Sequence, residues 1–319
     1  MIDTDNTFTK MFHKGQILFG RRRAYLKKAA VAEFDGICSG DITVIEAIPG
    51  KVDKNLLPFI IQNDALFDYA VSRSAGGLSP RVKWEQLSDY EFNLPPLEEQ
   101  KVLADKLWAA YRLKEGYKKL LAATDEMVKS QFIEMTTRSE LNKKSIGEIA
   151  EVRTGSTPSR SNPEYWNGTH YWVSAQDMGN KYIYDTLEKI TDKGYATCKV
   201  VPAGSILYVC RGSIGVMSIN TMDCATNQSI CTATCKKGYN TEYLYYALKV
   251  AEKTIKNQGI GTSFKSLNQS AFSSIEILFP AIEIQDKFAA IAKQADKSKF
   301  ELRKSIDAID KVIKSLINN

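Results

Sequence analysis

The chain contains one motif twice, as Leu94-Pro95-Pro96-Leu97-Glu98-Glu99-Gln100 and as Phe279-Pro280-Ala281-Ile282-Glu283-Ile284-Gln285. In both copies a short apolar stretch stops at a proline, and a long charged segment follows. Proline has no backbone donor and suits the first turn of a helix, so the motif predicts a strand that leads into a helix. The copies are 185 residues apart, a spacing typical of a duplicated domain and too long for a solenoid repeat.

A second match supports the duplication. Gly15-Gln16-Ile17-Leu18-Phe19 resembles Gly204-Ser205-Ile206-Leu207-Tyr208 at nearly the same spacing, and the small drift is what loop insertions produce. We therefore predict that each copy is a globular domain of mixed strands and helices. The strands that we predict are Tyr90–Leu94, Ser205–Cys210, Ser229–Thr234 and Ser274–Phe279, and the helices are Leu57–Ser72 and Thr241–Asn257.

The two charged segments carry a sustained heptad-like rhythm. Apolar or small residues recur at alternating steps of four and three, from Leu103 to Met135 and from Ile284 to Leu316. Such a repeat predicts helices that pack along each other as a coiled coil. Each has about 40 residues, or roughly 60 Å of helix. The alternative is two unrelated amphipathic helices, which the polar residues at some seam positions favour.

Composition limits the classes of protein. Of 319 residues, 44% are hydrophobic and 25% are charged, as in globular proteins, and no apolar run is long enough for a membrane helix. The acidic N-terminus lacks the apolar region of a signal peptide, so we expect a cytoplasmic location and no membrane partner. A net charge of +6 is compatible with nucleic-acid binding without indicating it.

Signs of catalysis or metal binding are weak. The six cysteines form no C-x-x-C pair, and two histidines give a zinc site little to use. We find no phosphate-binding glycine loop, zinc-protease motif or nucleophile elbow. A nuclease built on scattered carboxylates would leave no such motif, so these absences argue only weakly against an enzyme.

Four loops of the second copy could contact DNA. Arg153-Thr154-Gly155-Ser156-Thr157 combines hydroxyls and a glycine with a cation, as a phosphate contact needs. Arg211-Gly212 follows a predicted strand, and Asn227-Gln228 offers two amides able to read adenine. Ordinary turns are the alternative for each loop. The fourth loop resembles a phosphate clamp and contains Gly259, Gly261, Thr262, Ser263 and Lys265.

The first copy has a basic cluster of its own. Arg21-Arg22-Arg23 is the densest run of cations, and Arg81 and Lys83 follow a second glycine pair. We include these five residues among the candidate DNA contacts, although a solvated surface cluster is the simpler interpretation.

The order of these motifs resembles a known family. Thr154–Ser159 is followed by Asn162-Pro163-Glu164-Tyr165-Trp166-Asn167-Gly168 and Tyr171-Trp172-Val173. Arg211-Gly212-Ser213-Ile214-Gly215, Thr226-Asn227-Gln228-Ser229-Ile230 and the two closing proline motifs complete the match. Together they are similar to the specificity subunit of Type I restriction–modification enzymes.

The resemblance implies an α+β fold with two mixed α/β target recognition domains, the first incomplete, separated by two long antiparallel coiled-coil helices. The corresponding ranges are 1–96 for the first domain, 97–142 for the central helix, 143–280 for the second domain and 281–319 for the C-terminal helix. We then expect the helices to meet through one apolar seam, Leu103, Leu107 and Leu121 packing against Phe288, Ile291, Leu302 and Ile309.

The implied function is that of a non-catalytic subunit that binds double-stranded DNA at a bipartite site. Its expected partners are modification (methyltransferase) subunits and a restriction subunit. S-adenosylmethionine, ATP and Mg would belong to those partners, and no cofactor or metal to this chain. The alternatives are a coiled-coil scaffold that binds protein, an inactive or shuffled cassette, and, third, a nuclease or methyltransferase.

The first copy departs from the family pattern. Counting back from the second copy places about 45 residues of the first before Met1, including any counterpart of Thr154–Ser159. We therefore expect the first domain to lack part of its recognition surface. We also expect some of its strands to lack neighbours, which would leave them open to pairing with another chain.

Overall fold

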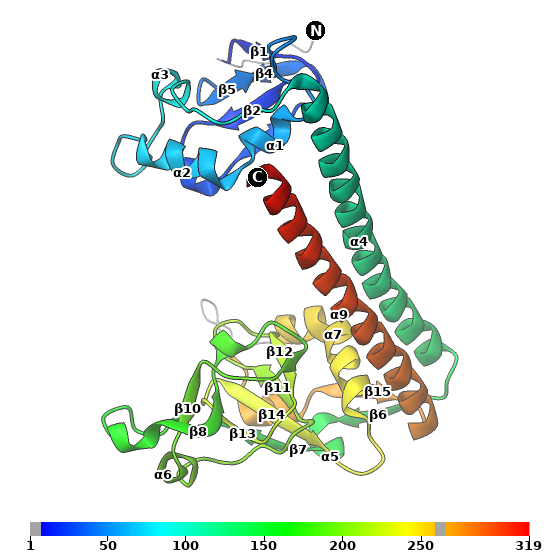
Figure 1. Ribbon diagram of the computed structural model, residues 1–319. Helices are drawn as coiled ribbons and strands as arrows, with labels where there is room; N and C mark the ends of the chain where they lie inside the picture. The colour runs from blue at the N-terminus through cyan, green and yellow to red at the C-terminus, as the bar shows by residue number, and fades with distance from the viewer. Residues whose placement is uncertain (1–7, 259–265, 319) are drawn as a thin grey trace. The chain divides into compact units, whose positions relative to one another are not determined.

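The computed structural model describes residues 8–258 and 266–318. It divides into two compact units, Met1–Leu121 with Phe300–Asn319, and Ala122–Lys299. Two long helices, α4 (Leu97–Thr137) and α9 (Ile282–Asn318), contribute to both units (Figure 1). Among the described residues, no helix combines the length and the apolar character needed to cross a bilayer.

Unit 1 is built on a three-stranded antiparallel sheet of order β3-β2-β5 beside a two-stranded ribbon, β1-β4. Phe19 of the central strand is fully buried and stacks on Phe67 of α2 at 5.3 Å between ring centroids. The elements are β1 (Lys10–Phe12), β2 (Ile17–Gly20), η1 (Ala24–Leu26), β3 (Ala29–Val31), β4 (Gly36–Cys38), β5 (Ile42–Ile45), α1 (Leu57–Ile61), α2 (Asp64–Ser72) and α3 (Trp84–Leu87).

Two predictions for unit 1 are wrong. The single helix expected over 57–72 is two helices, because Asn63 accepts a hydrogen bond from the Ala65 N–H and thereby starts α2 anew. The strand expected over 90–94 does not form, since these residues pair with no strand in the described part of the chain. A strand needs a partner to satisfy its backbone groups, and sequence propensity alone does not supply one.

Unit 2 is larger and contains three sheets. A five-stranded sheet has the order β7-β14-β11-β12-β9, a three-stranded sheet has the order β10-β8-β13, and β15 pairs with β6. The elements are β6 (Asn142–Ser145), α5 (Ile146–Ile149), β7 (Ala150–Thr154), η2 (Pro163–Tyr165), β8 (Trp166–Val173), η3 (Ala175–Asp177), β9 (Tyr182–Ile183), β10 (Glu188–Ile190), α6 (Asp192–Tyr195), β11 (Ile206–Val209), β12 (Met217–Asn220), β13 (Cys224–Thr226), β14 (Ile230–Cys235), α7 (Thr241–Gln258), α8 (Gln269–Ser273) and β15 (Glu276–Phe279).

The topology confirms the duplication. In unit 1, β2 lies between β3 and β5, and in unit 2 β11 lies between β12 and β14, all antiparallel. Ile17 of β2 faces Val31 and Ile45, whereas its counterpart Ile206 of β11 faces Ile219 and Ala233. The five-stranded sheet adds β7 and β9 outside this shared core of three strands.

The repeated glutamine has the same structural role in both units. Gln100 and Gln285 are 2% and 1% exposed, so their amides must be satisfied within the protein. Gln100 accepts from the Asp53 N–H at 2.8 Å and donates to the Pro95 carbonyl at 2.8 Å. Gln285 accepts from the Asn240 N–H at 2.9 Å and donates to the Pro280 carbonyl at 2.9 Å. This amide clamp explains why both motifs end in glutamine.

The helices α4 and α9 pack together in each unit, and the direction is antiparallel in both. In unit 1, Leu107 of α4 belongs to an apolar cluster with Leu316 of α9, and Lys114 pairs with Asp310. In unit 2, the Phe132 ring contacts Phe288 edge-on at 5.0 Å between centroids. The predicted fold class, mixed α/β domains with a pair of antiparallel long helices, is confirmed.

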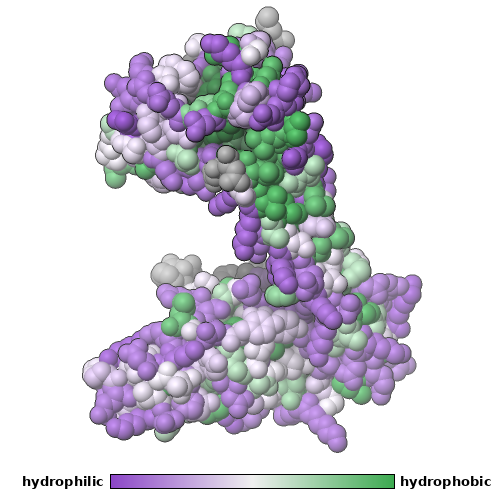
Figure 2. All heavy atoms as spheres, in the orientation of Figure 1, coloured by the Kyte–Doolittle hydropathy of each residue, from purple (hydrophilic) through white to green (hydrophobic). Residues whose placement is uncertain are grey.

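The partners of several seam residues differ from those expected. Leu103 and Leu107 cluster in unit 1 with Ile313, Leu316 and Ile317, where Figure 2 shows hydrophobic residues gathered over α1, α4 and the last turns of α9. Phe288 packs in unit 2 against Phe132. An antiparallel pair places the start of one helix against the end of the other, so these early residues cannot meet each other. Leu121, Ile291, Leu302 and Ile309 are half-buried.

Candidate nucleic-acid interface

The loop Thr154–Ser159 leaves the end of β7 and is held tightly against a neighbouring turn. Gly155 lies so close to this turn that an added Cβ would stand 2.1 Å from Thr226 Oγ1 and 2.4 Å from the Asn227 carbonyl oxygen. The Ser156 N–H donates to the Thr226 carbonyl at 2.8 Å. Only glycine permits this approach, so the loop and the turn form one continuous surface.

Two tryptophans donate hydrogen bonds to the backbone of the same loop. The Trp172 indole donates to the Ser156 carbonyl and the Trp166 indole donates to the Ser159 carbonyl, both at 3.2 Å. The two rings meet edge-on at 5.1 Å between centroids. Trp172 is buried and Trp166 half-buried. A buried indole N–H needs an acceptor, and both hydrogen bonds fix the backbone of the loop. The sequence placed both tryptophans in the family motifs, but it did not predict that their indoles hold the loop by hydrogen bonds.

Arg160, which the sequence analysis missed, extends the arrangement. Its guanidinium lies 3.7 Å from the centroid of the Trp166 ring and makes a two-pronged contact with the Glu188 carboxylate. The hydrogen bond to Glu188 raises the pKa of Arg160, and the pairing lowers the pKa of Glu188. The neighbouring indoles were the available signal, because arginine stacks well on aromatic faces.

The turn Asn227–Ser229 contains one inward and one outward amide. Asn227 Oδ1 accepts from the Ser229 N–H at 3.0 Å and from Ser229 Oγ at 2.6 Å, which is the turn-forming role considered as the alternative. Gln228 is exposed, and its Oε1 accepts from Thr157 Oγ1. Gln228 is therefore better placed than Asn227 to contact a base.

Arg211 stands beside this turn. The Cys210 N–H donates to the Ser229 carbonyl at 2.7 Å, which ties the loop after β11 to the turn. Gly212 has φ of 79°, a left-handed conformation that favours glycine. Arg211 itself is exposed, and its backbone bridges to Ser266. The surface formed by Thr154–Ser159, Asn227–Ser229 and Arg211 is called the loop platform below.

Arg153 is a weaker candidate for a DNA contact than Arg211. The Arg153 guanidinium pairs with Glu151 and donates to the Val200 carbonyl at 3.3 Å, so its charge is already partly neutralised. Thr154, at the end of β7, donates to Gln269 Oε1 at 3.1 Å. Thr262, Ser263 and Lys265 lie outside the described residues.

The basic cluster of unit 1 occupies the place of Arg211. Arg22 forms an isolated bridge with Arg81, and Arg211 forms the equivalent bridge with Ser266. The flanking backbone bonds also correspond: Val82 N–H to the Arg21 carbonyl, and Leu267 N–H to the Cys210 carbonyl. The two arginines thus hold equivalent positions in the duplicated fold.

Neighbouring groups moderate the charge of this cluster. Arg81 Nε lies 2.8 Å from Asp41 Oδ1, and Arg22 Nη1 lies 4.0 Å from Asp41 Oδ2. Arg21 donates to the Gly40 carbonyl, while Arg23 Nε donates to Ser79 Oγ at 3.3 Å. Lys83 is exposed at the start of α3. The cluster is therefore part of an internal network and not a freely solvated run.

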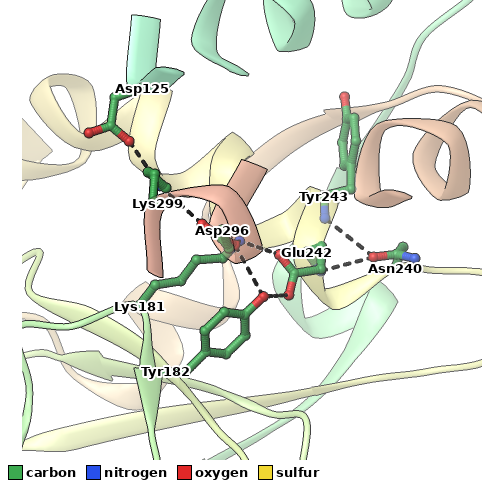
Figure 3. Close-up of polar contacts among 8 residues, drawn as sticks. All are labelled: Asp125, Lys181, Tyr182, Asn240, Glu242, Tyr243, Asp296 and Lys299. Atoms are coloured by element: carbon green, nitrogen blue, oxygen red, sulfur yellow. Dashed lines mark hydrogen bonds and ion pairs between the residues drawn. The ribbon is translucent and has the colours of Figure 1, made fainter. Parts of the chain in front are cut away.

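A buried ionic network fixes unit 2 internally (Figure 3). Lys181 Nζ lies 2.5 Å from both Glu242 Oε2 and Asp296 Oδ2, and Asp296 Oδ1 lies 3.0 Å from Lys299 Nζ. Lys299 also pairs with Asp125 of α4 at 2.9 Å. The network thereby joins the segment before β9 and helix α7 to both long helices. No local sequence signal reveals it, because Lys181 and Asp296 are 115 residues apart.

Proton equilibria in this network follow from burial and pairing. Burial alone would raise the pKa of Asp296, but the contacts with Lys181 and Lys299 outweigh it and lower that pKa. Burial likewise opposes the charge of Lys299, yet Asp125 and Asp296 raise its pKa. Burial, with a hydrogen bond to Glu242, holds the pKa of Tyr182 far above its ordinary value, so its hydroxyl stays a donor.

The cysteines form no disulfides, and possible metal ligands do not cluster in the described residues. All six cysteines are free thiols, with Cys38, Cys210, Cys224 and Cys231 buried. Within residues 8–258 and 266–318, no three His, Cys, Asp or Glu side chains gather as a metal site would require.

Comparison with known proteins decides the family. A family model described as the Type I restriction modification DNA specificity domain matches residues 3–122 and 138–310. The chain belongs to this family. The two matched segments follow the duplication, since the break between them falls within the C-terminal part of α4.

Named relatives agree with the family assignment. The MjaIX specificity subunit of Methanocaldococcus jannaschii is 33% identical over 183 residues, which are 55% of this chain and 42% of that protein. The HindI specificity subunit of Haemophilus influenzae is 29% identical over 55% of this chain and 40% of its own length. The matches thus span about two-fifths of these relatives.

A solved structure shares the fold. The S subunit of a type I restriction-modification system from M. genitalium superimposes with a TM-score of 0.61, at 14% identity, over 98% of this chain and 84% of that one. At this identity the likeness concerns the fold alone, and it covers both units.

Proposed function

We propose that this specificity-family chain is the DNA-reading subunit of a Type I restriction–modification complex, and that it directs adenine methylation and restriction to a bipartite site. The observation that carries the proposal is the loop platform. It joins a glycine-tightened hydroxyl loop, an outward glutamine and an exposed arginine, which are the groups that contact phosphates and base edges.

The equivalent position of Arg22 supports a second contact surface in unit 1. Arg22 and Arg211 follow corresponding strands and make corresponding bridges, so the two units can offer related cations to two segments of DNA. In this proposal the ranges 1–96 and 143–280 are the recognition domains, and 97–142 and 281–319 are the helices that hold modification subunits.

The chemistry would reside on the partners. Modification subunits would bind S-adenosylmethionine and transfer the methyl group, and a restriction subunit would use ATP and Mg. This chain would contribute affinity for particular bases and no reacting group.

Sequencing the methylated bases of host DNA, with and without this gene, tests the proposal. We expect loss of the gene to remove methylation from one bipartite adenine-containing motif. In a mobility-shift assay, the partner subunits should bind DNA that carries this motif only when the chain is present. A complex that forms without sequence-dependent affinity for DNA would instead favour a coiled-coil scaffold that binds protein.

A further inference from the structure

Arg160 lies on a turn that directly follows the loop platform. The Asn162 N–H donates to the Ser159 carbonyl at 3.2 Å, so Arg160 is the first central residue of a tight turn. The hydroxyls of Ser159 and Ser161, on either side of it, lie 2.8 Å apart. The Trp166 indole donates to the same Ser159 carbonyl at 3.2 Å. The backbone that carries Arg160 is therefore held in place on both sides.

An irregularity in the pairing of β8 with β10 places two groups beside this guanidinium. Trp172 of β8 is opposite Glu188 of β10, whereas Trp166 is opposite Ile190. The extra residues of β8 bulge out between these two pairs, and among them Asn167 has a left-handed φ of 62°. Bulges change the direction in which side chains project. Here both Trp166 and Glu188 reach the guanidinium.

These two contacts fix the plane of the guanidinium. Arg160 Cζ lies 3.7 Å from the centroid of the Trp166 ring, which covers one face. At the edge of the plane, Nη1 and Nη2 each donate to one oxygen of Glu188, the second at 2.8 Å. The side chains of Arg160 and Glu188 are 54% and 42% exposed, and ion pairs so exposed contribute little to stability. The arrangement therefore orients a surface cation more than it stabilises the fold.

The oriented guanidinium can still donate to a second partner. Of the five N–H donors of an arginine, the bonds to Glu188 use one hydrogen on Nη1 and one on Nη2. The Nε hydrogen and the Nη hydrogen beside it point in the same direction and form a second fork in the same plane. Such a fork matches two acceptors on one planar edge. Guanine N7 and O6 are the pair that arginine contacts most often in the major groove.

The carboxylate favours a base over a phosphate as the acceptor. Arg160 and Glu188 together have no net charge, and Glu188 would repel a phosphate that approached the same guanidinium. A phosphate also accepts hydrogen bonds from many directions, so it gains little from a fixed plane. A base edge is neutral and needs the fork in one orientation, which is what Trp166 and Glu188 provide.

We propose that Arg160 determines specificity in the second recognition domain by donating to N7 and O6 of one guanine in the major groove, and that Glu188 and Trp166 position it. This inference rests on the proposed function, because it requires that the loop platform faces DNA. It adds the identity of one base and a reading residue beyond the platform itself.

A library of random DNA duplexes, sequenced before and after binding by the assembled complex, measures base preference at each position. We expect Arg160→Ala to lower the preference for one guanine by roughly fivefold to 150-fold and to leave the other positions unchanged. Arg160→Lys keeps the charge but lacks the fork, so it should lose the same preference. Lys193→Ala is the matched control. Lys193 is an exposed cation that pairs with Glu164 at 3.0 Å in the same unit, and its loss should alter the preference at no position.

Glu188→Gln tests the positioning role separately. An amide has one acceptor oxygen and cannot hold both Nη groups, so the preference for the guanine should fall severalfold. The charge of Arg160 is then no longer offset, so affinity for nonspecific DNA should rise and its dependence on salt should steepen. A merely structural role would lower specific and nonspecific affinity together. Glu164→Gln, in the control pair, should leave the guanine preference unchanged.

Two results for Arg160→Ala would overturn the inference. One is a set of base preferences identical to that of the wild type. The other is weaker binding to all sequences alike, with a salt slope reduced by about one, which would make Arg160 a phosphate contact. With either result, clear base preferences of the wild-type complex would leave the proposed function standing. A wild-type complex without any base preference would overturn both.

Discussion

Gly155 is the residue on which the loop platform depends most directly. The nearest atoms to an added Cβ are those of Thr226 and the Asn227 backbone, and backbone cannot move aside cheaply. The loop also relies on two indole hydrogen bonds, so its geometry is determined by the core beneath it and not by the loop residues alone.

Replacing Gly155 should therefore separate the loop from the turn. We expect Gly155→Ala to lower the free energy of unfolding by about 1–3 kcal/mol, the usual cost of overpacking. Denaturant titration measures this loss. Gly116→Ala makes the same change at an exposed position of α4 with nothing nearby, and it should stabilise the helix by about 0.5–1 kcal/mol. Equal effects of the two substitutions would contradict the packing argument.

Arg211 is expected to supply a phosphate or base contact. Arg211→Ala should weaken DNA binding by the assembled complex and reduce the slope of log affinity against log salt by about one. Arg153→Ala should change the slope less, because Glu151 already pairs with that guanidinium. Titrations at several salt concentrations compare the two, and an unchanged slope for Arg211→Ala would remove Arg211 from the DNA surface.

The long helices depend on a few fully buried side chains. Leu107 is fully buried in the apolar cluster of unit 1, while Leu302 is only half-buried. We expect Leu107→Ala to cost about 2–5 kcal/mol and Leu302→Ala clearly less. Leu113→Ala, at a position that is 49% exposed, is the control. Thermal unfolding ranks the three variants, and a Leu113 effect as large as that of Leu107 would refute this packing.

The ionic network of unit 2 should make stability depend on pH. The folded pKa of Asp296 is lowered, so its contribution is present above the unfolded value near 4 and is lost as pH falls through the folded pKa. The folded pKa of Lys299 is raised, so its contribution is full below about 10.4 and is lost as pH rises through the folded value. Asp296→Asn should flatten the acid side of a plot of melting temperature against pH.

Lys181 holds two carboxylates in the same network. Lys181→Met leaves Glu242 and Asp296 without that partner in a buried site, which should cost about 3–5 kcal/mol. The double variant Lys181→Met with Glu242→Gln removes one stranded charge and should recover part of the loss. A double variant as unstable as the single one would show that the charge is not the cause.

At the level of the whole molecule, the proposed function predicts the form of the DNA target. Helices of 41 and 37 residues link the duplicated units, and each recognition surface can contact only a short stretch of groove. We expect two half-sites about one helical turn apart, with an unread gap. Inserting one base pair into the gap should abolish methylation, while changing the gap's sequence should not. Methylation sequencing of plasmids with both kinds of change checks this, and tolerance of the insertion would refute the spacing.

The amino-acid sequence by itself determined the duplication, the two long helices and three strands of unit 2, β11, β14 and β15. These features depend on short-range signals: proline at a helix start, a heptad rhythm, and short apolar stretches. The repeated glutamine was visible in sequence, but its buried clamp on Asp53 and Asn240 was not. Propensity likewise favoured a strand over 90–94, yet a strand exists only where a partner lies alongside.

Tertiary structure decided which side chains meet. Asn227 points into its own turn while Gln228 points outward, and nothing in the dipeptide distinguishes them. Tyr182 reaches Glu242 across 60 residues of sequence, and Lys181 reaches Asp296 across 115. Strand edges, ion pairs and buried amides are satisfied by groups far away in the chain. Their partners are therefore set by how the elements pack, and local sequence cannot specify them.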